Sequence, residues 1–292
     1  MQEPVIPQDP VADLADVLNI ESASETEFIG RTQWMPHGRV FGGQVLAQSM
    51  VAAMKTVDAS RPIHSLHSYF LRPGDIHQEI RFEVELLRDG KSFSARRVKA
   101  LQEDKPIFVL SASFQEPADG LEHQEEMPDG LPEPESLPSA RELLAAFDHP
   151  ATNYWSKARP FDLRHIEEPI YLKPASAEAN SQMIWFKTVS AFQGDAVLQT
   201  AALAYASDYT LLESVLRNHG VSWAEPGLNV ASLDHAMWFH SQPDVNDWML
   251  YVQHSPAATS GRGLAQGSIF SRDGRLLANI AQEGMVRVPK FR

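Results

Sequence analysis

The chain contains no cysteine among its 292 residues. This absence excludes disulfide bonds, thiolate nucleophiles and zinc sites with thiolate ligands. Any catalysis by this chain must therefore depend on aspartate, glutamate, histidine, serine or threonine.

Basic residues are scarce relative to acidic ones. The sequence holds 25 lysine and arginine residues against 38 aspartate and glutamate residues, a formal net charge of −13. Nucleic acid binding needs a basic face, so this balance argues against a nucleic acid partner. It does not exclude a phosphorylated small molecule, which needs only a local group of cations.

Long apolar runs are missing as well. No stretch approaches the ~18 consecutive apolar residues that a membrane helix needs. The start, MQEPVIPQDP, lacks the basic and apolar segments of a signal peptide, and the end, KFR, is not an SKL-type peroxisomal address. These features predict a cytoplasmic enzyme or binding protein without a membrane span.

Two catalytic motifs are also absent. The sequence has no nucleophile elbow of the G-x-S-x-G type and no glycine-rich phosphate loop. A serine hydrolase triad and a nucleotide-binding loop of that kind are therefore unsupported.

The sequence does contain the same order of predicted helices and strands in its two halves. Helical patterns are followed by strand-like segments rich in β-branched and aromatic residues and separated by Asp-Gly and Pro-Gly turns. The predicted parts are a first half at 1–115, an exposed acidic, proline-rich linker at 116–150, and a second half at 151–292. Each half predicts an antiparallel sheet wrapped around a helix, which is an α+β class.

Short echoes between the halves suggest a duplication. His67 matches His235 at an offset of 168, and Gln115 matches Gln282 at an offset of 167. These anchors place Gln44 opposite Asp208 at an offset of 164. The first half then carries an amide where the second carries a carboxylate, which predicts one functional site per chain, in the second half.

Seven motifs together resemble the acyl-CoA thioesterase II family. They are FGGQV, HSYFLRPGD, LRDGKSFSARRV, PIFVLSASFQ, YASD, LDHAMWFH and AQEGMVR, between residues 41 and 287. The resemblance implies a double hotdog fold, hydrolysis of fatty acyl-CoA to fatty acid and CoA, no metal or redox cofactor, and a homo-oligomer, either dimer or tetramer.

The resemblance also implies the catalytic residues. The aspartate of YASD is Asp208, the glutamine of the AQEG motif is Gln282, and the hydroxyl residue two positions before the Asp-His pair is Ser232. Such a set suits thioester hydrolysis, because an activated carbonyl needs a held water, a base and a stabilised oxyanion. We expect Asp208 to be the base and the other two to orient the water.

Other residues carry weaker expectations. His235 and the remaining histidines of the strand-like segments are expected to be packed or hydrogen-bonded, and Asp234 and His235 to point apart. Aromatic residues are expected to fill the core at Tyr69, Phe70, Trp238 and Phe239. A basic cluster could serve the phosphates of CoA, and it comprises Arg88, Lys91, Arg96, Arg97 and Lys99.

Two other functions stay open from the sequence. One is an acyl-thioester hydratase or dehydratase on the same fold, which needs a paired aspartate and histidine. The other is a non-catalytic acyl-CoA binding protein. The product separates the three: free thiol, an altered acyl chain, or binding without turnover.

Overall fold

A computed structural model describes residues 5–289 of the chain. The first half holds α1 (Pro10–Leu18), β1 (Glu21–Ser22), β2 (Glu27–Gly30), α2 (Gly42–Met54), β3 (Ile63–Phe70), β4 (Ile80–Asp89), β5 (Phe93–Gln102) and β6 (Lys105–Gln115). The second half holds β7 (Phe161–His165), β8 (Ser181–Thr188), α5 (Ala196–Ser207), α6 (Glu213–Arg217), β9 (Asn229–Ser232), β10 (Asp234–Phe239), β11 (Met249–Thr259), β12 (Arg262–Ser271) and β13 (Leu276–Arg287).

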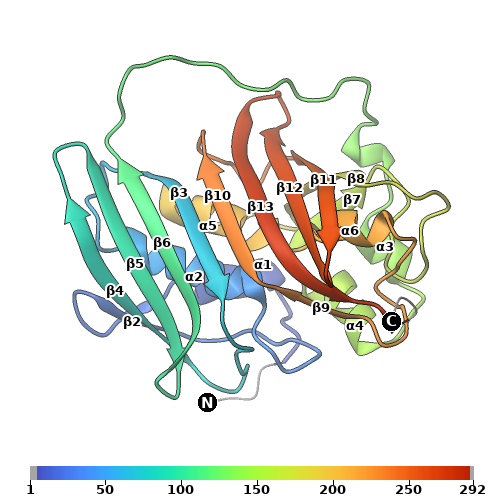
Figure 1. The fold of residues 1–292 in the computed structure, drawn as a ribbon, viewed down its shortest axis with the longest axis horizontal. Helices are drawn as coiled ribbons and strands as arrows, with labels where there is room; N and C mark the ends of the chain where they lie inside the picture. Colours follow the sequence, from blue (N-terminus) through green and yellow to red (C-terminus); the bar gives the residue numbers. More distant parts are fainter. Residues whose placement is uncertain (1–4, 290–292) are drawn as a thin grey trace.

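The strands of both halves form one antiparallel sheet. Its order is β1-β2-β4-β5-β6-β3-β10-β13-β12-β11-β8-β7, and β9 pairs with β13 outside this path. The halves join where β3 pairs with β10, so strands far apart in the sequence lie side by side at the centre (Figure 1). The two sheets expected from the sequence are therefore continuous through their edge strands.

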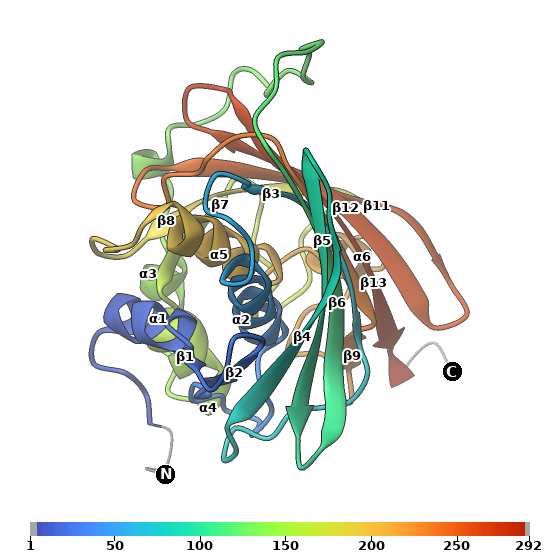
Figure 2. The same ribbon diagram turned by 90° about the vertical axis from the view of Figure 1, so that its left-hand side faces the viewer.

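Helices α2 and α5 lie on the inner side of the curved sheet (Figure 2). Most of the residues in each helix are buried, including polar ones such as Gln44 and Gln48 in α2. A helix with little polar face is stable only when it is covered on all sides. Glycine makes the contact between these helices possible, because a Cβ on Gly43 would lie 2.3 Å from the carbonyl oxygen of Tyr205.

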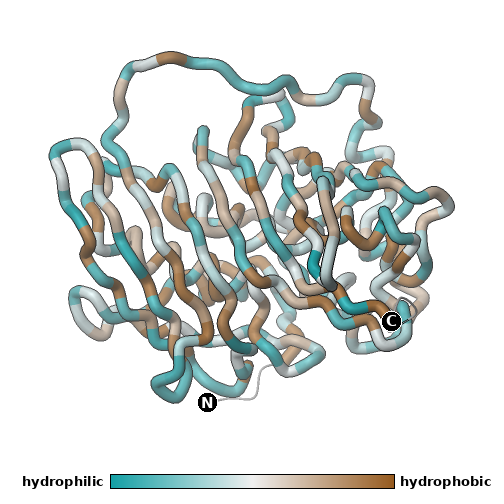
Figure 3. Tube along the Cα trace, in the orientation of Figure 1, coloured by the Kyte–Doolittle hydropathy of each residue, from teal (hydrophilic) through white to brown (hydrophobic). Residues whose placement is uncertain are grey.

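The linker is only partly the exposed segment that its composition predicts. Its first part is largely hydrophilic and runs over the end of the sheet (Figure 3), where Gln124 Nε2 donates to the carbonyl oxygen of Gly274. Short helical turns then follow: η1 (Pro134–Ser136), α3 (Ala140–Leu144), α4 (Pro150–Asn153) and η2 (Tyr154–Ala158). Ala140 and Leu144 are buried against Tyr171, so apolar burial folds the end of this segment despite its acidic surroundings.

Two of the four aromatic residues expected in the core are not there. Phe70 and Phe239 pack against the core, whereas Tyr69 is 60% exposed and Trp238 is 38% exposed. Successive residues of a strand face opposite sides of the sheet, so adjacent aromatic residues cannot both be buried under one layer of helices.

The same alternation contradicts the register of the sequence repeat. His235 is buried, but His67 lies on the exposed face, where its ring packs against that of Trp238 at 5.3 Å. Similarly, Gln282 is buried, whereas Gln115 follows the buried Phe114 and faces the other way. The architecture is duplicated, but these anchors are not equivalent, because an odd shift in register exchanges the two faces.

Among residues 5–289 no helix combines the length and apolar character required to span a bilayer.

Candidate active site

Asp208 is placed by the end of helix α5. The helix begins at its N-cap, where Asp195 Oδ1 accepts from the backbone N–H of Leu198, and it ends with Asp208 as the C-cap residue. The surrounding sequence is apolar, so this end of the helix lies inside the molecule. Asp208 is half-buried as a whole residue, while its carboxyl group is buried.

The structure brings the three predicted catalytic residues together. The amide Nε2 of Gln282 donates to Asp208 Oδ1 at 2.9 Å and to Ser232 Oγ at 2.6 Å. The hydroxyl of Ser232 donates to the same oxygen of Asp208 at 3.3 Å. Strand β9 pairs with β13 so that Ser232 lies opposite Gly284, two residues from Gln282, which accounts for the contact.

The first half contributes a helix end to this site. Helix α2 begins at Gly42, and a Cβ there would lie 2.5 Å from Asp208 Oδ2, so only glycine allows this approach. The backbone N–H of Gly43 hydrogen-bonds to the carboxylate of Asp208. The positive end of a 13-residue helix therefore faces the carboxylate of the other half.

Burial raises the pKa of Asp208 from its ordinary value of 3.8 to about 6, because removal from water disfavours the charged carboxylate. The hydrogen bonds from Gln282, Ser232 and Gly43 act in the opposite direction, since they favour the charged form. A carboxyl group with such a pKa is ionised at neutral pH and is a stronger base than an exposed aspartate.

His235 is the residue of the site that sequence reasoning missed. It is fully buried, with Nδ1 at 2.7 Å from Gln282 Oε1 and Nε2 at 2.9 Å from Ser207 Oγ. Desolvation lowers its pKa to about 4, so the imidazole is neutral near pH 7. Because Oε1 can only accept, Nδ1 carries the proton, and this bond turns the amide Nε2 of Gln282 toward Asp208.

The expectation that His235 is hydrogen-bonded is confirmed, and so is the divergence of Asp234 from it. Asp234 accepts from the backbone N–H of Glu283 instead. The signal that could have revealed the role of His235 is its place on the strand next to that of Gln282, on the same face.

The proposed equivalence of Gln44 and Asp208 is wrong. Gln44 lies in the first turn of α2, whereas Asp208 ends α5. The amide of Gln44 is buried and donates to the carbonyl oxygen of Arg31 and to Gln48 Oε1. Gln44 thus holds the chain around α2. The offset failed because the chain from α5 to β10 contains α6 and β9 and is longer than the chain from α2 to β3.

Arg96 does not belong to the surface part of the basic cluster. Arg96 is 2% exposed, and its guanidinium bonds to Asp89 and Thr56, whereas Arg97 is exposed and pairs with Glu85. Their opposite faces agree with the alternation expected of a strand. The buried Arg96 stabilises the fold and is not available to a CoA phosphate.

No group of three or more histidine, aspartate or glutamate side chains within residues 5–289 is arranged to hold a metal ion.

The fold is one sheet of two joined halves that curves around two central helices. The site combines a carboxylate, an amide and a hydroxyl where the halves meet. Together they define a double hotdog protein of the thioesterase class. The sequence matches the family described as acyl-CoA thioesterase over residues 166–285. It also matches the acyl-CoA thioesterase N-terminal domain over residues 31–115.

Known proteins similar to this chain cover nearly all of it. It is 39% identical over 279 residues to acyl-CoA thioesterase 2 of Haemophilus influenzae, with 94% of this chain and 96% of that protein covered. It is 39% identical over 298 residues to acyl-coenzyme A thioesterase 8 of Homo sapiens, with 96% and 92% covered. The crystal structure of acyl-CoA thioesterase II TesB2 from Mycobacterium marinum has a TM-score of 0.79 and 38% identity, over 96% of this chain and 100% of that one. The chain belongs to the acyl-CoA thioesterase II family.

Proposed function

We propose that this acyl-CoA thioesterase hydrolyses fatty acyl-CoA with a water molecule activated by Asp208. One observation carries the proposal: the buried carboxylate of Asp208 is hydrogen-bonded to both Gln282 and Ser232, and its pKa is raised to about 6. The hydrogen bonds of these two residues converge on Oδ1 of Asp208, which leaves Oδ2 as the oxygen for the water.

The reaction then needs a single acid–base group. Asp208 takes one proton from the water as the water oxygen bonds to the thioester carbon. The tetrahedral intermediate collapses, the C–S bond breaks, and the CoA sulfur takes the proton back from Asp208. The products are fatty acid and CoA, and Asp208 ends as the carboxylate with which it began.

The oxyanion of the intermediate needs hydrogen-bond donors that are already in place. We assign this role to the backbone N–H of Gly42, at the start of α2 beside Asp208, because the N–H of Gly43 bonds to Asp208 and those of Gln44 and Val45 bond to the carbonyl oxygen of Phe41. The helix dipole adds a favourable field for negative charge at this point. In this proposal the first half supplies the oxyanion site and the second half supplies the base.

The experiment is release of free thiol, measured over a series of acyl-CoA chain lengths for the natural chain and for Asp208→Asn. We expect the substitution to lower the rate by at least ~10²-fold, because the amide cannot accept the proton. Turnover that is unchanged in a folded Asp208→Asn variant rejects the general-base assignment, whatever the chain length.

The hydratase alternative has less support at the site. Gln282 lies between Asp208 and His235, so these two groups do not form a direct acid–base pair. The dehydratase domain of RzxB from Pseudomonas fluorescens shares only the fold, with 10% identity and a TM-score of 0.53. Analysis of the acyl product in the same assay detects hydration, and binding without thiol release identifies a non-catalytic protein. The cytoplasmic location and the homo-oligomer stay predictions.

A further inference from the structure

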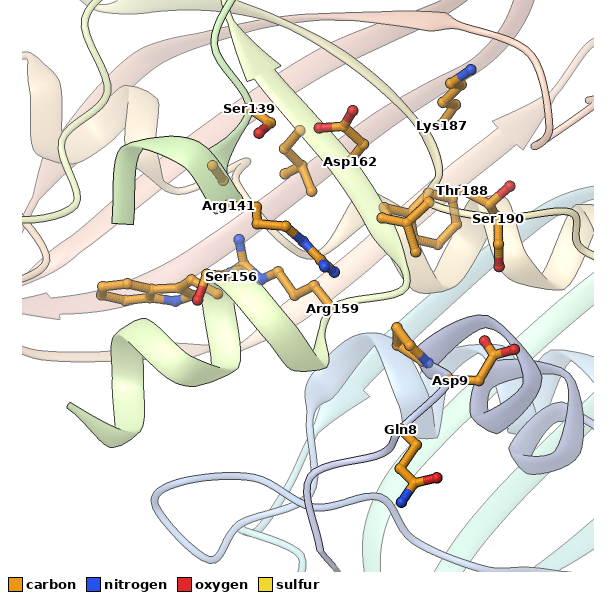
Figure 4. A pocket seen from close by; sticks show the side chains of 16 residues that line it. Gln8, Asp9, Ser139, Arg141, Ser156, Arg159, Asp162, Lys187, Thr188 and Ser190 are labelled. Carbon is orange, nitrogen blue, oxygen red and sulfur yellow. The ribbon is translucent and has the colours of Figure 1, made fainter. Parts of the chain in front are cut away.

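A cavity lies beside Arg141 and Arg159 (Figure 4). Its volume is about 510 Å³, and it lies between the start of α1, helix α3, the turn η2, strand β7 and the segment after β8. A volume of this size is typical of a site for a small organic molecule. Its walls include the rings of Trp155 and Phe161 and the hydroxyls of Ser139, Ser156 and Thr188.

The distinctive group in this cavity is the guanidinium of Arg159. Arg159 is only 7% exposed, and its Nε and Nη1 atoms are buried without a hydrogen-bond partner. Its Cζ lies over the ring of Tyr209 at 4.4 Å and over the ring of Tyr154 at 5.3 Å. These rings attract the cation through their π faces, but they do not replace the hydrogen bonds that a buried guanidinium loses on leaving water.

The nearby buried carboxylate is already engaged. Glu213 lies close enough to interact with the charge of Arg159, yet no hydrogen bond joins the two within residues 5–289. The oxygens of Glu213 accept instead from Trp223 Nε1 and Gln182 Nε2 and contact His165 Nε2. The charge of Arg159 is therefore left without a bonded counter-ion inside the protein.

The other charges of the cavity add to this imbalance. Asp9 caps helix α1 through the backbone N–H groups of Val11 and Ala12, and Asp162 pairs with Arg164. Arg141 also lines the cavity and makes no ion pair with any residue in 5–289. The third cation of the lining, Lys187, lies over the ring of Trp248 at 4.9 Å. Arg159 and Arg141 thus face a cavity whose acids are bound elsewhere.

We propose that this cavity is a second ligand site, which binds a small organic molecule through a carboxylate or phosphate group held between Arg159 and Arg141. The oxyanion supplies the counter-charge, because a guanidinium binds both groups with paired N–H donors. The body of the ligand packs on Trp155 and Phe161. The guanidinium of Arg159 lies on the ring of Tyr209, the residue after Asp208, so a bound ligand is linked to the catalytic aspartate through this contact.

The test is calorimetric titration of the full chain at constant ionic strength with phenyl phosphate and with benzoate. Benzyl alcohol, which has the ring without the charge, is the control ligand. We expect saturable binding of at least one anion and none of the alcohol, and the anion that binds decides between phosphate and carboxylate. The proposal is overturned if neither anion binds saturably, or if the alcohol binds as tightly as the anions.

Variants locate the site. Arg159→Met keeps the length of the side chain without its charge, and we expect it to weaken anion binding at least ~10-fold, by loss of a charge-assisted hydrogen bond. If this variant fails to fold, Arg141→Gln tests the exposed partner and should weaken binding at least ~3-fold by the same loss. Arg81→Gln, on the other half, is the matched control and should bind as the natural chain does. Unchanged affinity in the Arg159 variant, or in the folded Arg141 variant, refutes the site without bearing on hydrolysis.

Discussion

Replacing His235 by phenylalanine tests whether the orientation of Gln282 limits the reaction. Phenylalanine keeps the planar ring and fills the buried space but removes both nitrogens. Gln282 Oε1 then loses the donor that lies 2.7 Å away. Ser207 Oγ loses its contact with Nε2 at 2.9 Å but can still donate to the carbonyl oxygen of Ala204 at 2.8 Å. The substitution acts on Asp208 only through Gln282, because His235 makes no hydrogen bond to Asp208 within residues 5–289.

The expected loss of kcat follows from the Oε1 atom of Gln282, which is left without a hydrogen-bond donor. Leaving a buried acceptor without a donor costs roughly 1–3 kcal/mol. Without the bond to His235 the amide of Gln282 can also rotate, and its oxygen would then face the carboxylate 2.9 Å away. Since about 1.4 kcal/mol corresponds to tenfold in rate, kcat should fall roughly 5- to 150-fold.

The assay is steady-state thiol release from pH 5 to 8. We expect a lower kcat with KM within about threefold, because the proposed mechanism uses Gln282 to orient the reacting water and not to bind CoA. The acidic limb of the pH profile should stay near 6, since it reports the carboxyl group of Asp208 and not the imidazole.

The matched control is His240→Phe. His240 also hydrogen-bonds to an amide, that of Asn279 at 2.8 Å, but on the exposed side of the sheet. The His240→Phe variant should therefore retain full activity. A folded His235→Phe variant with unchanged kcat, or one that changes KM alone, contradicts the orienting role.

Three further outcomes follow. The raised pKa of Asp208 means that its proton is held more tightly in the folded state, so this group's contribution to stability is present below pH 3.8 and lost as the pH rises through 6. Asp208→Asn should therefore gain stability relative to the natural chain between pH 4 and 7, by up to about 3 kcal/mol in urea unfolding, and a constant difference contradicts the shift. Gly42→Ala puts a Cβ at 2.5 Å from Asp208 Oδ2 and should lower kcat roughly 10²-fold. The control is Gly120→Ala, whose Cβ would meet nothing within 4 Å and which should show no loss of kcat. Arg96→Ala should cost about 2–4 kcal/mol in the free energy of unfolding but leave KM for acyl-CoA unchanged, and a raised KM in a folded variant would restore a role in CoA binding.

Several features of this protein could be predicted from the sequence. The alternation and turn residues predicted an antiparallel sheet and a helix in each half, since these signals act between near neighbours in the chain. The motifs around Asp208, Ser232 and Gln282 indicated the chemistry, and the structure places these three side chains in contact. The acidic composition gave no sign of the helical turns η1 and α3 within 116–150.

Other features depend on contacts between distant segments. The sequence echo paired Gln44 with Asp208 and His67 with His235, and both pairings are wrong, because matching letters do not reveal which face of a strand or which end of a helix a residue occupies. Tertiary packing brought the start of α2 to the carboxylate of the other half.

The sequence by itself determined which side chains could act and which local elements would carry them, because residue type and periodicity are properties of the chain. Only the tertiary structure decided the pKa of Asp208, the direction of the Gln282 amide and the unpaired charge of Arg159. Each of these depends on burial and on hydrogen bonds between segments that meet only after folding.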